Sequence, residues 1–360
     1  MTRSQPAHEP LLDGVRGLAI LLVIFFHSSL IPVKNSMDKI LHGAALGGWA
    51  GVDLFFVLSG FLITGILLRT KEAPNFFFNF YMRRTLRILP LYYLFLILAF
   101  YVVPQTVQFG FTYWTFLSNI LLGRLGQFQS PVLDITWSLA VEEQFYLLWP
   151  LVVWATKREK LEKVAALLFF LSLGTRLGLF LSGSNAMKNY VLLICRMDSL
   201  CAGAWLACRI QTLSPGFLRK IFFSFLGIVA VIFAMDVGVL SPIMRTVGYS
   251  ANAVLAASLI GCLCKPEPFF LKSLFGSKFL RLCGKYSFGM YLFHMPLIHW
   301  MYSQGQTFWM GFPIQVLFHV LSALGTLLVA MLFYHGYEKH FLRLKKYFEN
   351  QPELVTALAS

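Results

Sequence analysis

Long apolar runs separated by short polar segments constrain this sequence more than any other feature. An α-helix needs about 17 to 25 mostly apolar residues to cross the hydrocarbon core of a bilayer. Ten segments satisfy this requirement. They are residues 15–31, 46–68, 86–104, 138–155, 163–182, 190–208, 220–236, 245–264, 286–303 and 313–335. A further aromatic run at 111–123 is too short to span, so we expect it to lie at the interface or to re-enter.

The composition agrees with a membrane protein. Hydrophobic residues make up 58% of the chain and charged residues 13%, against about 25% charged residues in a soluble domain. The net charge of +14 is spread between apolar segments, which predicts membrane orientation and no nucleic-acid partner. We therefore expect an all-α fold, a polytopic bundle of about ten transmembrane helices with the lipid bilayer as its surroundings.

The basic residues also predict the orientation of the chain. If the N-terminus is cytoplasmic, 22 of the 30 lysines and arginines fall in cytoplasmic segments, four fall in outer segments, and the rest lie in or beside spans. This bias places both termini in the cytoplasm. We expect a cytoplasmic segment at 1–14, one transmembrane domain at 15–338 and a short basic cytoplasmic tail at 339–360. No small-residue cleavage site follows the first apolar run, so it is expected to remain as a span.

The first apolar segment carries an ionisable residue at each end. Arg16 and His27 are eleven residues apart, which is about 1,100° of helical rotation and a rise of about 16 Å. Both side chains should therefore share one face, with Arg16 at the cytoplasmic edge and His27 near the outer end. This arrangement suits a conduit between two compartments. The alternative is that two interfacial residues share a face by chance.

Three carboxylates are expected at the depth of His27. Asp53, Glu142 and Glu143 each lie in the outer third of a predicted span. A carboxylate beside an imidazole can orient it for general base chemistry. Glu142 and Tyr146 are four residues apart and should share a helix face, with Glu143 pointing elsewhere. The alternative for the carboxylates is structural pairing with in-span arginines, namely Arg176, Arg196 or Arg245.

A cluster of arginines opens the third apolar segment. Arg83 and Arg87 are four residues apart, and Arg84 and Arg87 are three apart. Guanidinium groups clustered in this way suit phosphate binding. The same cluster could also act as an ordinary cytoplasmic membrane anchor.

Other ionisable residues within spans also need an explanation, because they are costly in a bilayer. Arg196 and Asp198 are two residues apart and face different ways, so each needs a partner on another helix. His294 lies in the middle of the ninth predicted span, as a structural hydrogen bonder or as a functional residue. No zinc-binding spacing accompanies it, and we expect no metal.

Six motifs that occur in order resemble the acyltransferase 3 family of integral membrane proteins. They are LDGVRGLAILLVIFFH, GVDLFFVLSGFLIT, RRTLRILPLYY, TWSLAVEEQFYLLWP, RMDSLCAGAWLA and KYSFGMYLFHMPLI. The resemblance covers roughly residues 8 to 340. It implies about ten helices, a cytoplasmic acyl-CoA donor, an acceptor hydroxyl that is often on a sugar, and a multi-pass protein of a bacterial inner membrane.

The resemblance also implies roles for particular residues. The arginine and histidine of the family's first helix match Arg16 and His27, and its serine-glycine stretch matches Ser59 and Gly60. Its basic cluster matches Arg83, Arg84 and Arg87, and its tryptophan-serine-glutamate segment matches Trp137, Ser138, Glu142 and Glu143. Some members carry an extracytoplasmic esterase-like SGNH domain. The charge count places the end of this chain in the cytoplasm, so we expect no such domain here.

These observations predict a membrane acyltransferase. It would move an acyl group, acetyl in the first instance, from cytoplasmic acyl-CoA to a hydroxyl of a sugar or glycan, with transfer on the extracytoplasmic side as one arrangement. His27 would take the hydroxyl proton or carry the acyl group, and Asp53 or Glu142 would orient its ring. The CoA phosphates are assigned to Arg16, Arg83, Arg84 and Arg87. Substrate binding is assigned to Ser59, Trp137, Glu143, Arg196, Asp198 and His294.

A transporter is the alternative prediction. Buried Arg, Asp, Glu and His residues in a ten-helix bundle also suit a proton-coupled exporter of a saccharide or lipid intermediate. A guanidinium cluster suited to phosphate, together with dependence on CoA, would favour the enzyme. Tolerance of the loss of His27 would favour the exporter.

Overall fold

The computed structural model describes residues 10–29, 36–235, 238–304 and 312–349, and these residues form helices and connecting turns without a strand. The predicted all-α class is confirmed. The α-helices are α1 (Pro10–His27), α2 (Ser36–Leu46), α3 (Ala50–Thr70), α4 (Phe76–Val102), α5 (Gly110–Trp114), α6 (Ser118–Leu125), α7 (Thr136–Ala155), α8 (Arg158–Leu181), α9 (Ala186–Val191), α10 (Leu193–Arg209), α11 (Pro215–Ala234), α12 (Tyr249–Cys264), α13 (Lys272–Phe275), α14 (Lys278–Ser303), α15 (Phe312–Phe333) and α16 (Lys339–Arg343).

Each predicted span overlaps one long helix. These helices are α1, α3, α4, α7, α8, α10, α11, α12, α14 and α15. Among the described residues, eight helical stretches are long and apolar enough to cross a membrane, and α7 and α14 are not among them. Both carry polar side chains inside their apolar stretches, such as Glu142 in α7 and His294 in α14. A polytopic helical bundle is therefore confirmed, while the count of ten spans and the cytoplasmic termini remain predictions.

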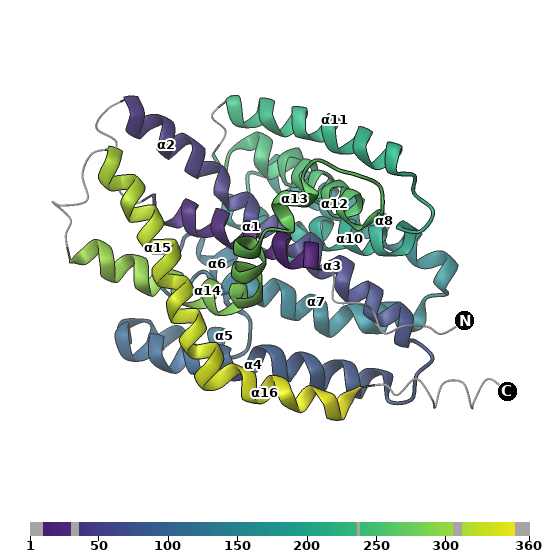
Figure 1. Cartoon of the computed structure of the whole chain (residues 1–360), viewed down its shortest axis with the longest axis horizontal. Helices are drawn as coiled ribbons and strands as arrows, with labels where there is room; N and C mark the ends of the chain where they lie inside the picture. The colour runs from purple at the N-terminus through teal and green to yellow at the C-terminus, as the bar shows by residue number, and fades with distance from the viewer. Residues whose placement is uncertain (1–9, 30–35, 236–237, 305–311, 350–360) are drawn as a thin grey trace.

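The helix α1 lies in the middle of the bundle, with α3 and α14 as close neighbours (Figure 1). Glycines allow the backbones of these helices to touch, as in many membrane bundles. A Cβ atom on Gly17 would lie 1.9 Å from the carbonyl oxygen of Leu280, and one on Gly284 would lie 1.8 Å from that of Asp13. The close approach of α1 and α14 brings residues of the two helices together along the bundle.

A second close contact joins α3 and α10. A Cβ atom on Gly60 would lie 1.9 Å from the carbonyl oxygen of Leu200, and one on Gly203 would lie 1.9 Å from that of Val57. The two glycines therefore act reciprocally, each accommodating the backbone of the other helix. This contact sets the distance between the polar residues that α3 and α10 carry.

The outer faces of several helices present large apolar side chains. Leu167, Phe170 and Leu181 of α8 and Val231 of α11 are all exposed. A water-soluble protein rarely exposes such continuous apolar surface, whereas the hydrocarbon core of a bilayer accommodates it. The expected lipid surroundings match these faces.

Two short elements complete the fold. The aromatic run at 111–123 forms parts of α5 and α6, which are too short to cross a membrane, as predicted. The described part of the predicted tail, residues 339–349, continues from α15 and lies along α4 (Figure 1). The rings of Phe78 and Phe348 pack at 5.7 Å. Residues 350–360 of the tail lie outside the described residues.

Candidate functional site

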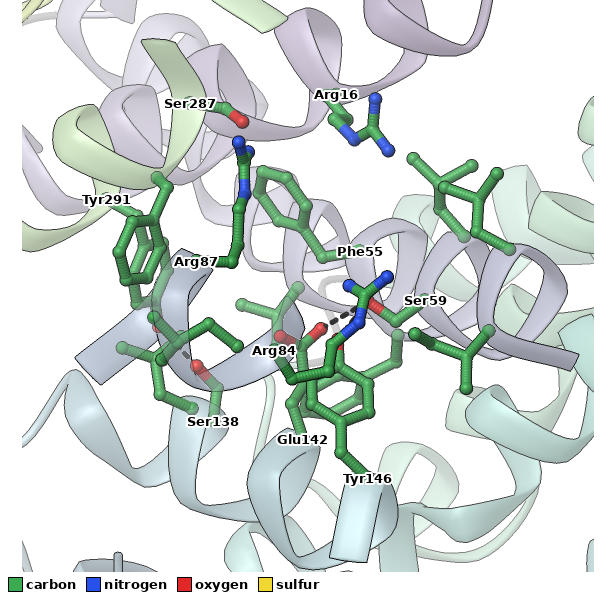
Figure 2. Close-up of a pocket in the computed structure, with 18 residues that line it drawn as sticks. Arg16, Phe55, Ser59, Arg84, Arg87, Ser138, Glu142, Tyr146, Ser287 and Tyr291 are labelled. Atoms are coloured by element: carbon green, nitrogen blue, oxygen red, sulfur yellow. Dashed lines mark hydrogen bonds between the residues drawn. The ribbon is translucent and has the colours of Figure 1, made fainter. Parts of the chain in front are cut away.

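A cavity of about 140 Å³ lies between α1, α3, α4, α7 and α14. Three arginines line it, Arg16 from α1 and Arg84 and Arg87 from α4. Figure 2 shows Arg16 and Arg87 in the upper part of the view, Arg84 lower down with Ser59 and Glu142, and Tyr291 to one side. The predicted association of Arg16 with the arginine cluster of α4 is therefore found in the structure.

The arginines of the cavity keep unused hydrogen-bond donors. Arg84 Nε is buried and has no hydrogen-bond partner in the described part of the chain. Arg16 Nη1 donates to Asp13 Oδ1 at 2.6 Å, which uses one of the N–H groups of that guanidinium. Arg87 Nη1 lies 3.9 Å from Glu338 Oε1, beyond hydrogen-bonding distance. Three guanidinium groups with free N–H donors suit an anion with several oxygens, such as a phosphate.

A serine joins two residues of α7 at the floor of the cavity. Ser59 Oγ donates to Glu142 Oε1 at 2.7 Å, and the Tyr146 hydroxyl donates to Ser59 Oγ at 3.0 Å. The predicted common face of Glu142 and Tyr146 is confirmed. These contacts hold the serine of α3 against α7.

Glu142 does not lie beside His27 as expected. The structure places this carboxylate with Arg16 and Arg84 in the cavity instead of beside His27. The apolar run of this segment alone predicts a helix that starts at the membrane surface. In fact residues 132–141 are all buried, so α7 begins inside the protein. The buried Asp134 holds this start, because it accepts hydrogen bonds from Tyr113 and from the backbone N–H of Ser130 at 2.7 and 2.6 Å.

His27 lies beside a second histidine. His27 Nδ1 is 3.0 Å from the carbonyl oxygen of Val23 and 3.1 Å from His294 Nε2. His294 is fully buried, and its Nδ1 lies 2.6 Å from the carbonyl oxygen of Tyr291. His27 Nε2 has no hydrogen-bond partner among the described residues. The histidine of α1 thus has a histidine partner on α14.

Tyr291 connects the cavity to the histidine pair. Its side chain lines the cavity, and its ring centroid lies 5.6 Å from that of His294. Its hydroxyl lies 2.6 Å from Ser138 Oγ and donates to the carbonyl oxygen of Ile135 at 2.8 Å. The sequence prediction did not single out Tyr291, although its position three residues before His294 places both on one helix face.

Asp53 does not contact His27 in the structure. Its carboxylate forms an ion pair with Arg196 and accepts hydrogen bonds from Ser199 and Asn252 at 3.1 and 3.4 Å. The expectation that Asp53 or Glu142 touches the imidazole therefore fails. The alternative prediction, a structural pair with an in-span arginine, is the one found for Asp53. Its partner is Arg196, because α3 and α10 meet at the glycine contact described above.

A second buried ion pair lies beside the first. Arg176 Nη2 of α8 donates to Asp198 Oδ2 at 2.8 Å, and Ser250 donates to the same oxygen at 2.7 Å. The predicted need of Arg196 and Asp198 for partners on other helices is confirmed. Both residues lie outside the wall of the cavity.

Three further predicted residues also lie outside the cavity wall. Trp137 is buried against Tyr190, with the ring centroids 4.7 Å apart. Glu143 has a buried Oε1 without a hydrogen-bond partner in the described residues. Arg83 is partly exposed, and its Nη1 lies 3.9 Å from Glu349 Oε1. Their predicted binding roles remain untested. Of the residues predicted to bind CoA or the substrate, Ser59, Arg16, Arg84 and Arg87 line the cavity.

The arginine donors of the cavity suit a negatively charged ligand. Among the described residues, no group of three or more His, Cys, Asp or Glu side chains could hold a metal. The unpartnered Nε of Arg84 points instead to a negatively charged ligand. The phosphates of an acyl-CoA fit this donor set.

The fold and site define a multi-pass membrane protein with an arginine-lined cavity and a histidine pair that joins the central helix α1 to α14. A family model described as an acyltransferase domain matches residues 10–335. The chain therefore belongs to the acyltransferase 3 family, and the resemblance of its motifs is confirmed. The family and the apolar helices together identify an integral membrane protein.

Several bacterial proteins are similar to this chain. The peptidoglycan O-acetyltransferase OatA of Listeria monocytogenes is 29% identical over 327 residues, covering 82% of this chain and 50% of the relative. The putative peptidoglycan O-acetyltransferase YrhL of Bacillus subtilis is 32% identical, covering 92% and 54%. The O-acetyltransferase OatA of Staphylococcus aureus is 29% identical, covering 92% and 57%. The chain thus spans about half the length of these curated relatives, and no solved structure matches it.

Proposed function

We propose that this chain transfers an acetyl group from acetyl-CoA to a hydroxyl of a cell-envelope glycan. The observation that carries the proposal is the pair of sites on α1, with Arg16 in the arginine cavity and His27 in the histidine pair. The names of the relatives support O-acetylation and support peptidoglycan as the acceptor. A bacterial inner membrane is the proposed location.

The arginine cavity is the proposed donor site. Arg16, Arg84 and Arg87 bind the phosphates of CoA, because their free donors match phosphate oxygens. The pantetheine arm then runs from the cavity past Tyr291 toward the histidines. Glu142 and Ser59 shape the cavity through their hydrogen bond and do not contact His27.

His27 is the proposed general base. Its Nε2 removes the proton of the acceptor hydroxyl while the hydroxyl oxygen attacks the thioester carbonyl carbon. The C–S bond breaks, and the sulfur leaves as the CoA thiol with the proton that His27 returns. The products are the O-acetylated glycan and free CoA. A two-step route through acetyl-histidine uses the same nitrogen as a nucleophile.

The test uses purified protein in nanodiscs with radiolabelled acetyl-CoA. Wild type is compared with His27→Ala, with the double variant Arg84→Ala/Arg87→Ala, and with Arg83→Ala as a matched control outside the cavity wall. We expect the double variant to lose acetyl-CoA binding, and Arg83→Ala to keep it. We expect His27→Ala to bind acetyl-CoA without turnover.

Either of two results would overturn the proposal. One is a wild-type protein that does not bind acetyl-CoA. The other is a His27→Ala variant with full turnover. Saccharide transport in liposomes, measured on the same variants, would then test the exporter alternative.

A further inference from the structure

The histidine pair contains an asymmetry that follows from its hydrogen-bond partners. Each ring places its Nδ1 against a carbonyl oxygen of its own helix, Val23 for His27 and Tyr291 for His294. A carbonyl oxygen can only accept a hydrogen bond, so each neutral ring carries its hydrogen on Nδ1. His294 is the clearer case, because its Nδ1 contact is 2.6 Å and its side chain is fully buried.

The state of His294 then determines what it offers to His27. With the hydrogen on Nδ1, His294 Nε2 has a lone pair and can only accept. This nitrogen lies 3.1 Å from His27 Nδ1. His27 Nδ1–H therefore donates to two acceptors, the carbonyl oxygen of Val23 and His294 Nε2. The lone pair of His27 is left on Nε2.

We infer that His294 is a positioning residue that, together with the carbonyl oxygen of Val23, holds His27 in the tautomer with a free lone pair on Nε2. The inference rests on the proposed function, in which that lone pair receives the hydroxyl proton. The two helices that carry the rings pack closely against each other, with glycine contacts at Gly17 and Gly284 toward their other ends. A neutral imidazole thus takes the orienting role that a carboxylate plays in a catalytic triad.

His294 also accommodates the charge that develops on His27. When His27 Nε2 gains a proton, the positive ring donates its Nδ1–H more strongly to the acceptor on His294. Two aromatic rings also lie beside the pair, Phe26 at 5.0 Å from His27 and Tyr291 at 5.6 Å from His294, measured between ring centroids. His294 Nε2 is therefore the side-chain acceptor that the described residues supply to the charged ring.

Two matched variants of His294 test the inference. In His294→Gln the side-chain oxygen reaches the place of Nε2 and can accept from His27. His294→Met has a similar length without that acceptor. We expect His294→Gln to retain most of the wild-type kcat. We expect His294→Met to lower kcat about 100-fold, within the usual contribution of general base catalysis, with an unchanged KM for acetyl-CoA.

A spectroscopic measurement separates this inference from the proposed function. The ¹⁵N shifts of labelled histidine report which ring nitrogen carries hydrogen, and the signals of His27 are identified by their loss in His27→Gln. We expect the Nδ1–H tautomer in wild type and in His294→Gln. In His294→Met the carbonyl oxygen of Val23 is the remaining acceptor, and we expect a measurable share of the Nε2–H tautomer to appear. An Nε2–H tautomer in wild type, or an unchanged tautomer and kcat in His294→Met, overturns the inference. The expected shifts without acetyl transfer would support it and refute only the proposed function.

Discussion

Asp53 of α3 and Arg196 of α10 form an ion pair whose two side chains are almost completely buried. The Arg196 guanidinium lies over the ring of Tyr249, 4.0 Å from its centroid. Its Nε and Nη1 atoms have no hydrogen-bond partner among the described residues. A buried charge that depends this strongly on one carboxylate is expensive to leave alone, and removing one partner of such a pair costs about 3 to 5 kcal/mol.

The first prediction concerns this pair. Asp53→Leu leaves Arg196 without its carboxylate, so we expect the free energy of unfolding to fall by about 3 to 5 kcal/mol. The double variant Asp53→Leu/Arg196→Met removes both charges and should recover most of that loss. Denaturant unfolding in detergent, monitored by tryptophan fluorescence, measures the free energy of unfolding of both variants. Unchanged stability of Asp53→Leu together with lost turnover would instead identify Asp53 as a catalytic residue.

The glycine contact between α3 and α10 gives a second prediction. Gly60→Ala and Gly203→Ala each place a Cβ atom 1.9 Å from a carbonyl oxygen of the other helix. The helices must move apart, and we expect a loss of about 1 to 3 kcal/mol, typical of overpacking. Gly178→Ala in α8 is the control, because a Cβ there meets no atom within 4 Å. Equal melting temperatures for all three variants would show that the close contact does not limit stability.

Glu142 provides a test of the cavity's charge. This carboxylate shares the cavity with three arginines, so its charge opposes the binding of an anion there. We expect Glu142→Gln to lower the Kd of CoA about three- to tenfold, which corresponds to roughly 1 kcal/mol of Coulomb energy. Calorimetric titration in nanodiscs measures the change. A weaker affinity of Glu142→Gln for CoA would contradict this prediction. It would mean that the Glu142 carboxylate supports CoA binding.

The two acidic residues beside the α4 arginines form a matched pair of variants. Glu338 lies 3.9 Å from Arg87, which lines the cavity, and Glu349 lies 3.9 Å from Arg83, which does not. We expect Glu338→Gln to strengthen CoA binding about two- to fivefold, the range of a weak ion pair. Glu349→Gln should leave the Kd unchanged. Equal effects of the two variants would place Arg83 in the donor site as well.

Much of the helical architecture follows from local features of the sequence. The apolar runs predict the long helices, because a backbone in lipid must satisfy its hydrogen bonds within the helix. The spacing of Arg16 and His27 predicts a shared face; in the structure Arg16 lines the cavity that α14 also borders, and His27 contacts His294 of α14. These features depend only on residues that are close together in the chain.

The contacts between helices could not be predicted in the same way. His294 is visible in the sequence as an in-span histidine, but nothing in its spacing indicates that α14 packs against α1. Asp53 has three possible arginine partners in the sequence, and the meeting of α3 with α10 selects Arg196. The depth of Glu142 depends on the buried start of α7, which has no signature in hydropathy. Small residues indicate close packing but do not identify the neighbouring helix.

One consequence follows from the position of Arg16 and His27 on a single rigid helix. The helical rise fixes their separation at about 16 Å along the axis, and α1 packs against α3 and α14. On the proposed function, this separation sets the length of the donor that fits. The phosphates and the thioester of the donor must be as far apart as the side chains of Arg16 and His27. A short donor such as acetyl phosphate could occupy one end or the other but never both. The length of the donor between its phosphates and its thioester would then determine which donors are accepted, independently of the acyl group that they deliver.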